Sequence, residues 1–234
     1  MVRTPRHLPA PRELVQSKAQ WTHRWGEICV GRKKGDWATK GAKSVLKRAL
    51  LRLAHGKCAF CEGTLGSQGY LQIEHYVAKT VDPSLTFEWT NLLPACAPCN
   101  GAKGHQDHRN LLLKSDDEDP EPYFWINPDN GELEPHPSLD DDGKARALTT
   151  IQLCKLQRGQ LCEKRHRMAM HVGHWLNRAS VCGENLTGDL AKELDWLLRP
   201  ATEYKLAIRH VLELRGAGKL AQEDRQRFEA PTAV

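Results

Sequence analysis

The chain has 234 residues, enough for one domain with an appended element or for two small domains, so its core needs no disulfides. Hydrophobic residues make up 40% and charged residues 27% of the sequence, and the formal net charge is +5. These values exclude collagen, coiled coils and bulk disorder, and no run approaches the ~20 apolar residues of a membrane span. Because Met1 to Pro11 lacks the apolar stretch of a signal peptide, we expect a cytoplasmic protein that does not contact a membrane.

Charge is distributed unevenly along the chain. Residues 1–58 contain 14 Lys or Arg and 3 acidic residues, whereas residues 115–142 contain 11 acidic residues and no Lys or Arg. The basic segment predicts a polyanionic partner, although two solvated segments would give the same pattern. One hypothesis is that the acidic segment shields the basic surface until a substrate competes for it.

The first expected elements are an extended arm over residues 1–12, a helix over 13–28 and a basic loop over 31–41. A second helix is expected over 42–54, because its apolar residues recur at helical spacing. This stripe consists of Val45, Leu46, Ala49, Leu50 and Leu53. We expect the tryptophans at 21, 25 and 37 to pack against neighbouring helices or a partner rather than to stack on bases.

Residues 115–144 predict a long acidic loop with a short strand or two, a short apolar run at 123–126 and a solvated turn at 140–142. Residues 145–180 are expected to be mainly helical. Residues 188–215 predict two helices, the second of which opens at Pro200, and the polar tail after Gly216 is expected to fray.

Four of the eight cysteines form two pairs with the same spacing, Cys58-x-x-Cys61 and Cys96-x-x-Cys99. Each C-x-x-C turn directs two thiolates at one tetrahedral ion, and two such turns complete a four-cysteine shell. The alternatives are two disulfides or a redox pair. A reducing compartment disfavours disulfides, and a thioredoxin-like site needs only one C-x-x-C. The spacing therefore predicts a structural Zn2+ site.

Polar residues of a second kind lie between and beside the cysteine pairs. Glu74 and His75 end a short expected strand, Asn91 precedes the second pair, and Asn100 directly follows Cys99. A lone His is more often structural than catalytic, and a lone Asn is usually a turn or cap residue. Their common placement around the predicted zinc site is what makes them candidates.

Together, the cysteine pairs, the acid–His pair and the two Asn resemble the HNH endonuclease family in its zinc-bound form, over about residues 57–104. The resemblance implies an α+β protein whose small ββα-metal HNH core, with its four-cysteine zinc site, is embedded in mostly helical N- and C-terminal regions. A weaker likeness to HNH nucleases of Septu and retron-associated anti-phage systems extends over Pro9–Leu14, Cys58–Glu62 and Thr150–Arg165. Those nucleases work beside an ATPase.

The expected organisation follows from this core. Residues 1–56 form a basic N-terminal arm with helices, 57–110 the nuclease core with zinc, 111–144 an acidic loop region, and 145–234 a helical C-terminal region.

The resemblance also implies a role for each residue. His75 would be the general base, since its ordinary pKa of ~6.5 lies near working pH. Glu74 and Asn100 would bind a catalytic Mg2+ or Mn2+, because hard cations prefer oxygen ligands, and Asn91 would position the base. The family more usually has Asp where this chain has Glu74, so the ion is expected to sit slightly differently.

A basic cluster follows Asn100 and supplies candidate phosphate contacts, although a solvated helix end would look the same. These residues are Lys103, His105, His108 and Arg109. The whole pattern predicts a metal-dependent endonuclease that cuts DNA or possibly RNA. The resemblance implies that it is the effector of an anti-phage system with an ATPase partner. The alternative is a non-catalytic zinc module that binds nucleic acid or a partner protein.

Overall fold

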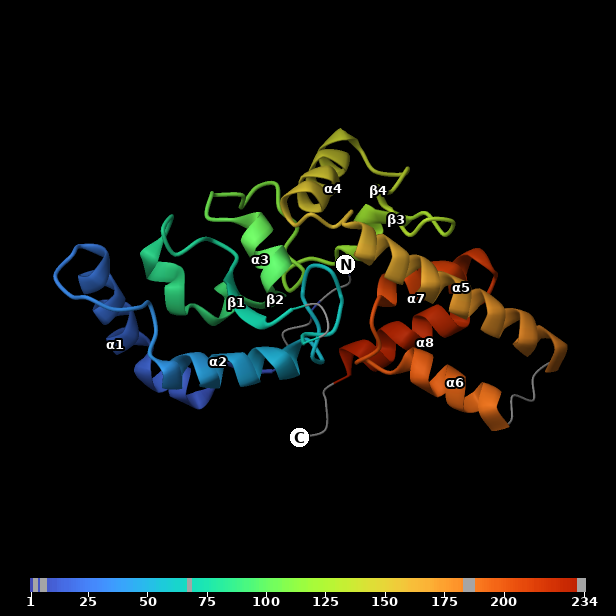
Figure 1. Ribbon diagram of the computed structural model, residues 1–234, viewed down its shortest axis with the longest axis horizontal. Coiled ribbons are helices and arrows are strands. Elements are labelled where there is room, and N and C mark those ends of the chain that lie inside the picture. Colours follow the sequence, from blue (N-terminus) through green and yellow to red (C-terminus); the bar gives the residue numbers. More distant parts are fainter. Residues whose placement is uncertain (2–3, 5–7, 67–68, 183–187, 231–234) are drawn as a thin grey trace.

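The computed structural model describes residues 1, 4, 8–66, 69–182 and 188–230, and it is elongated (Figure 1). Helices α1 (Arg12–Cys29) and α2 (Lys40–Leu53) form one end of the molecule, and the helices after residue 158 form the other. The strands and the helix that carry the predicted site lie between these ends. The predicted extended arm falls in part on residues 2–3 and 5–7, outside the described residues.

Helices α1 and α2 confirm the two helices predicted in this region. The side chain of Thr39 caps α2 by accepting the Ala42 N–H. The buried residues of α2 recur at helical spacing and form one side of the helix. This side packs against Leu14 of α1 in a cluster that also contains Phe87 and Leu92. The three tryptophans at 21, 25 and 37 pack in or against the same cluster, as expected.

The central unit consists of two antiparallel strands followed by a helix. Strand β1 (Leu71–His75) pairs with β2 (Leu92–Cys96), and α3 (Ala97–Lys103) starts directly after β2. Short 3-10 helices, η1 (Pro83–Phe87) and η2 (Trp89–Asn91), occupy the connection between the strands. Helices α2 and α3 both contact the strand pair, so residues from the N-terminal region support the predicted site.

The acidic segment contains the short strands expected in it, and it is otherwise more ordered than a long loop. It contains η3 (Glu121–Tyr123) and a second antiparallel pair, β3 (Phe124–Ile126) with β4 (Leu133–Pro135). Glu118 pairs with Arg146, and Glu121 pairs with Arg209 and Arg225. These carboxylates therefore bind arginines from the C-terminal region and not the basic residues 1–58.

The turn at residues 140–142 is a helix start and not the solvated loop expected from its composition. Helix α4 (Asp141–Leu153) begins there, and the Asp140 carboxylate accepts the Gly143 N–H at 2.8 Å. Acidic residues in a first helical turn also interact favourably with the helix dipole. The expected helical region 145–180 consists of two helices, because α4 ends before α5 (Gly159–Cys182) begins.

Two expectations for the C-terminal region were wrong. Helix α6 (Gly188–Leu198) is followed by α7 (Lys205–Leu214), so Pro200 lies in the connecting turn and does not open α7. Its carbonyl instead accepts a hydrogen bond of 2.6 Å from Lys57 Nζ. The tail after Gly216 forms α8 (Gly218–Glu229), because Ala221, Asp224 and Phe228 are buried against the rest of the protein.

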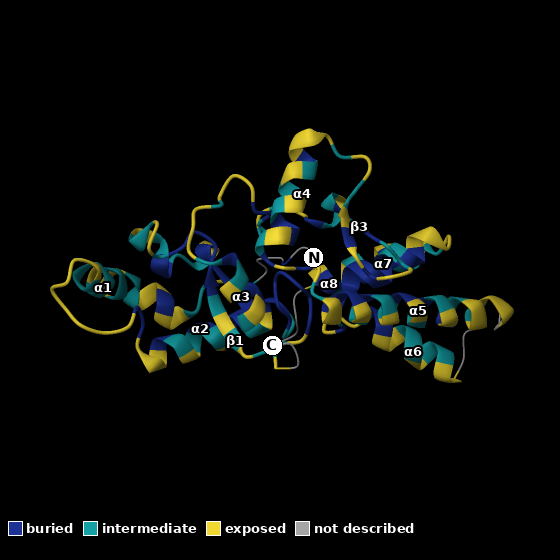
Figure 2. Cartoon of the chain, turned by 45° about the horizontal axis from the view of Figure 1, so that its top comes forward, coloured by how far each residue is buried: buried dark blue, intermediate teal, exposed yellow. Residues whose placement is uncertain are grey.

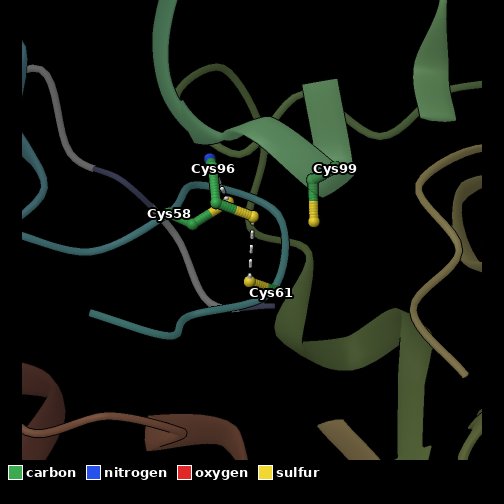
Figure 3. A group of neighbouring side chains, drawn as sticks. All are labelled: Cys58, Cys61, Cys96 and Cys99. Carbon is green, nitrogen blue, oxygen red and sulfur yellow. Dashed lines mark hydrogen bonds between the residues drawn. The ribbon is translucent and has the colours of Figure 1, made fainter. Parts of the chain in front are cut away.

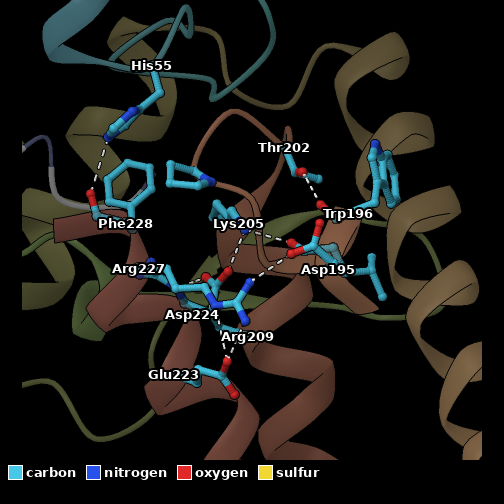
Figure 4. A network of polar contacts seen from close by, with 12 residues as sticks. His55, Asp195, Trp196, Thr202, Lys205, Arg209, Glu223, Asp224, Arg227 and Phe228 are labelled. Carbon is cyan, nitrogen blue, oxygen red and sulfur yellow. Dashed lines mark hydrogen bonds and ion pairs between the residues drawn. The ribbon is translucent and has the colours of Figure 1, made fainter. Parts of the chain in front are cut away.

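A buried ionic network joins α7 and α8 (Figure 4). Lys205 and Asp224 are fully buried and form an ion pair, and Arg209 Nε donates to the second oxygen of Asp224 at 2.7 Å. Arg209 also reaches Glu121 of the acidic segment at 2.6 Å. The network thus fixes α7 and α8 against residues about a hundred positions earlier in the chain.

Burial runs through the centre of the molecule (Figure 2). One core cluster contains the four paired cysteines together with Phe124 and Ile126 of β3, Ile151 of α4 and Leu206 of α7. The predicted zinc site is therefore packed against the C-terminal region. Among the described residues, no helix is long and apolar enough to cross a membrane.

Candidate functional site

The two cysteine pairs converge on one point, as their spacing predicted (Figure 3). Their four Sγ atoms lie within 4.8 Å of one another, all four side chains are buried, and none forms a disulfide. The Sγ atoms of Cys61 and Cys96 are 3.9 Å apart. A tetrahedral zinc–thiolate site with bonds of ~2.3 Å has sulfur atoms about 3.8 Å apart, so the cluster could bind a metal such as zinc.

Each cysteine pair is held by a different part of the fold. Cys58 and Cys61 belong to the turn after α2, whereas Cys96 ends β2 and Cys99 lies in the first turn of α3. The Cys96 N–H donates to the Cys58 Sγ at 3.3 Å. Burial raises the pKa of the Cys58 thiol, so a divalent ion would have to displace protons from this cluster.

A small pocket of about 50 Å³ brings together three of the predicted catalytic residues. Glu74, His75 and Asn100 line it, together with Lys79 and His105. The first two end β1 and the third lies in α3, immediately after Cys99. Asn91 is not among the residues that line this pocket.

His75 is buried and has a defined protonation state. Its Nε2 lies 3.1 Å from the Thr86 carbonyl oxygen, which can only accept, so Nε2 carries the proton and Nδ1 does not. The ring packs edge-on against Trp37, with centroids 4.7 Å apart. Burial lowers the pKa of His75 to about 3, and the nearby Lys79 ammonium acts in the same direction. The imidazole is therefore neutral at neutral pH.

Glu74 faces a buried lysine. Lys103 Nζ lies 2.7 Å from Glu74 Oε1, an ion pair without hydrogen-bond alignment, and donates to the His75 carbonyl at 3.1 Å. Burial raises the pKa of Glu74 to about 7, although the Lys103 ammonium offsets part of this shift. Because Lys103 contacts Oε1, Oε2 is the carboxylate oxygen left for another ligand.

Asn100 and Asn91 have different environments. Asn100 is half-buried, and its Nδ2 donates to the Gln72 side chain, which leaves Oδ1 available as a ligand atom. Asn91 is buried, and its Oδ1 accepts the Val77 N–H at 2.8 Å. Its Nδ2 donates to the carbonyls of Val77 and Leu85, both at 3.0 Å. Asn91 thus ties the segment after His75 to η1.

The four candidate phosphate contacts do not form one surface. Lys103 is buried beside Glu74, whereas His105 is exposed and lines the pocket. His108 is half-buried, and Arg109 is exposed but forms an ion pair with Asp107 at 2.6 Å. Of these four, His105 is the one that shares the pocket with Glu74 and His75.

Sequence reasoning missed several residues that shape the pocket. Lys79 lies four positions after His75, and Gln72 precedes Glu74 by two positions on the same strand face, so both could have been found from their spacing. Trp37 is different. Its contact with His75 spans 38 positions, and no local sequence pattern predicts this contact.

Comparison with known proteins supports one group of relatives. No protein-family model matches the chain. The chain is similar to Septu proteins named PtuB. It is 41% identical over 68 residues to one from Bacillus thuringiensis, a match that covers 29% of this chain and 26% of that protein. It is 24% identical over 152 residues to one from Bacillus mycoides (strain KBAB4), covering 54% and 52%. The chain thus spans between about a quarter and half of the length of the curated relatives it matches.

Proposed function

We propose that this protein is a metal-dependent endonuclease of the HNH type that hydrolyses phosphodiester bonds in DNA or RNA. The observation that carries the proposal is the shared pocket of Glu74, His75 and Asn100, a few residues from a four-cysteine cluster. The pocket combines a neutral imidazole with carboxylate and amide oxygens, which are the groups that phosphodiester hydrolysis requires. A purely structural zinc module has no need of this combination.

His75 is the proposed general base. Its unprotonated Nδ1 takes a proton from a water molecule, whose oxygen forms the new bond to phosphorus. The bond to the leaving oxygen breaks, and that oxygen takes its proton from solvent. A pKa near 3 makes the free imidazole a weak base. A phosphate anion bound beside the ring raises this pKa again, so the base becomes stronger when the substrate is present.

Glu74 and Asn100 are the proposed ligands of a catalytic Mg2+ or Mn2+. Both offer oxygen atoms to the pocket, a donor set that suits hard divalent cations. When bound, the ion supplies Lewis-acid stabilisation of the phosphate and of the leaving oxygen. Lys103 balances the charge of Glu74 from the opposite carboxylate oxygen and holds the His75 backbone.

The four cysteines are proposed to hold a structural Zn2+. With four thiolate ligands, no position is left for a water molecule, so this site cannot activate one. Its role is to join the turn after α2 to the start of α3. Since Asn100 follows Cys99 directly, the zinc site would also orient Asn100, a proposed ligand of the catalytic ion.

We further propose that the nuclease acts in anti-phage defence with an ATPase as its partner. The support is the similarity to the Septu proteins PtuB, which covers up to 54% of this chain. The basic N-terminal region is proposed to contact the nucleic acid. In the alternative, the protein binds nucleic acid or a partner without cutting.

The test is a cleavage assay on plasmid DNA, single-stranded DNA and tRNA with Mg2+ or Mn2+. The protein is assayed alone and with any ATPase that is encoded next to it. We expect His75→Ala to abolish cleavage while zinc content stays near one per chain. A matched control is His174→Ala, which replaces an exposed histidine on α5 and should leave cleavage unchanged.

The outcomes separate the two functions. Cleavage that survives in His75→Ala would remove the base assignment. If no substrate is cut in either setting while the wild type still binds nucleic acid, the non-catalytic module is the better description. Cleavage that appears only with the ATPase would identify a gated effector.

A further inference from the structure

An arginine from the C-terminal region reaches the cysteine cluster. Arg158 lies in the turn between α4 and α5, and its Nη2 donates to the Cys99 Sγ at 3.4 Å. Its Nη1 donates to the carbonyls of Cys154 and Lys155, both at 3.0 Å. The guanidinium is therefore held by three acceptors, and one of them is a predicted metal ligand 59 positions earlier in the chain.

The chemistry of the cluster calls for such a donor. Four thiolates around Zn2+ carry a net charge of −2, and all four cysteine side chains are buried. Buried charge is expensive unless it is paired and hydrogen-bonded. A second arginine, Arg165, is also buried nearby, but its guanidinium donates hydrogen bonds to the carbonyls of Gly131 and Leu156. In the part of the chain that the structure describes, Arg158 provides the charged hydrogen bond to a cluster sulfur.

The contact also crosses between regions of the fold. Cys99 lies in the first turn of α3, next to Asn100, whereas Arg158 follows the end of α4. A second link runs in parallel, since Glu62, directly after Cys61, accepts the Leu206 N–H of α7 at 3.1 Å. The C-terminal region thus contacts both halves of the cysteine cluster.

We propose that Arg158 is a positioning residue for the metal in the four-cysteine site. Its charge-assisted hydrogen bond lowers the electron density on the Cys99 sulfur, offsets the negative charge of the tetrathiolate and slows metal loss. It also fixes the first turn of α3 against the α4–α5 turn. The proposal rests on metal binding by the four cysteines and is independent of whether the protein cuts nucleic acid.

The test compares Arg158→Met, Arg158→Lys and the wild type after loading with Zn2+ or Co2+. Outer-sphere partners of metal ligands typically change affinity 10–100-fold. We therefore expect Arg158→Met to lose zinc to a chelator about 10–100-fold faster than the wild type. In the Co2+ form, the sulfur-to-cobalt charge-transfer band should move to lower energy, because the sulfur lone pair loses a donor. Arg158→Lys keeps the positive charge but lacks the planar guanidinium with its several donors, so it should be intermediate in both measurements.

The matched control is Arg167→Met, which removes an exposed arginine of α5 that pairs with Glu163. It should match the wild type in both measurements. A folded Arg158→Met protein with the wild-type band and release rate would overturn the proposal. If Arg158→Met does not fold, Arg158→Lys is compared with the wild type alone. Faster zinc release than in the wild type supports the hydrogen bond, and a wild-type rate with an unshifted band overturns the proposal.

Discussion

Asn91 holds Val77 at both of its backbone polar groups, accepting the N–H at 2.8 Å through Oδ1 and donating to the carbonyl at 3.0 Å through Nδ2. The same Nδ2 also donates to the Leu85 carbonyl. The segment that follows His75 is thereby tied to η1, whose Thr86 carbonyl accepts from the His75 ring. Asn91 therefore supports His75 indirectly. It fixes the backbone of Val77 and of η1, and the Thr86 carbonyl of η1 accepts from the His75 ring.

Replacing Asn91 should therefore disturb both stability and the proposed chemistry. Asn91→Ala leaves the buried Val77 N–H and carbonyl without partners, and we expect a loss of about 2–4 kcal/mol in the free energy of unfolding. Urea denaturation measures this loss, and metal analysis should show that zinc is retained. The exposed Asn110 offers a control, because Asn110→Ala should change stability by less than about 0.5 kcal/mol. Equal effects of the two variants would contradict the positioning role of Asn91.

Trp37 should matter to His75 despite its distance in sequence. The indole is buried and lies 4.7 Å from the His75 ring and 5.5 Å from the Phe87 ring, measured between centroids. Trp37→Ala opens a cavity beside His75, so we expect destabilisation by about 3–5 kcal/mol and a loss of cleavage. Trp37→Phe preserves a ring and should retain most of both. Cleavage rates and thermal unfolding check these outcomes, and wild-type cleavage in a folded Trp37→Ala protein would refute the link.

Removing the metal from the four-cysteine site should unfold more than the site itself. Structural Zn2+ contributes about 10–16 kcal/mol in small zinc domains, comparable to or larger than the whole stability of a typical domain. Cys96→Ser, or a strong chelator, should therefore disorder the core cluster that the cysteines share with β3, α4 and α7. Hydrogen exchange locates the disordered residues. Cys29→Ser, at an exposed cysteine, is the control, and a stable Cys96→Ser protein without zinc would argue against a structural site.

The buried pair of α7 and α8 makes a sharp stability prediction. Asp224→Asn leaves the buried Lys205 ammonium without its counter-charge and Arg209 with Glu121 alone, and breaking such a buried pair costs about 3–5 kcal/mol. Asp195→Asn removes an exposed carboxylate that also pairs with two arginines, and it should cost at most about 1 kcal/mol. Chemical denaturation of both variants tests the difference. Similar losses would show that burial does not govern this network.

Nucleic-acid binding should depend on salt through α2. On this helix Lys47 is half-buried and Arg52 is exposed, and no ion pair involves either of them within the described residues. Each phosphate contact contributes about one unit to the slope of log affinity against log salt concentration. Lys47→Gln with Arg52→Gln should thus reduce the slope by about two. Lys192→Gln with Lys219→Gln makes the same charge change far along the chain, and an equal effect would exclude a localised α2 contact.

The sequence predicted those features of the site whose residues lie close together in the chain. C-x-x-C spacing correctly predicted the cysteine cluster, because a turn of four residues places two thiols on one side. Apolar periodicity correctly predicted the helices near 13–28 and 42–54. The pocket residues Glu74, His75 and Asn100 were chosen by resemblance, and their common pocket is consistent with that choice.

Composition was misleading for three polar segments. The run at 140–142 looked like a solvated loop, yet Asp140 caps α4. The tail after Gly216 looked too polar to be ordered, but α8 buries Asp224 against Lys205 and Arg209. Lys103 looked like a cation for phosphate, and it is buried beside Glu74. Asp224 and Lys103 thus have partners that the local sequence does not reveal, whereas Asp140 caps a backbone N–H only three positions later.

The sequence by itself determined each C-x-x-C turn, the strand-ending acid–His pair and the amphipathic helices, because these depend on spacings of a few residues. Only the tertiary structure decided which groups surround them. The Trp37 ring against His75, the Lys103 ammonium beside Glu74 and the Arg158 guanidinium on Cys99 are contacts between residues 29 to 59 positions apart. Such contacts depend on how whole elements pack, and packing is specified by the entire chain and not by any motif within it.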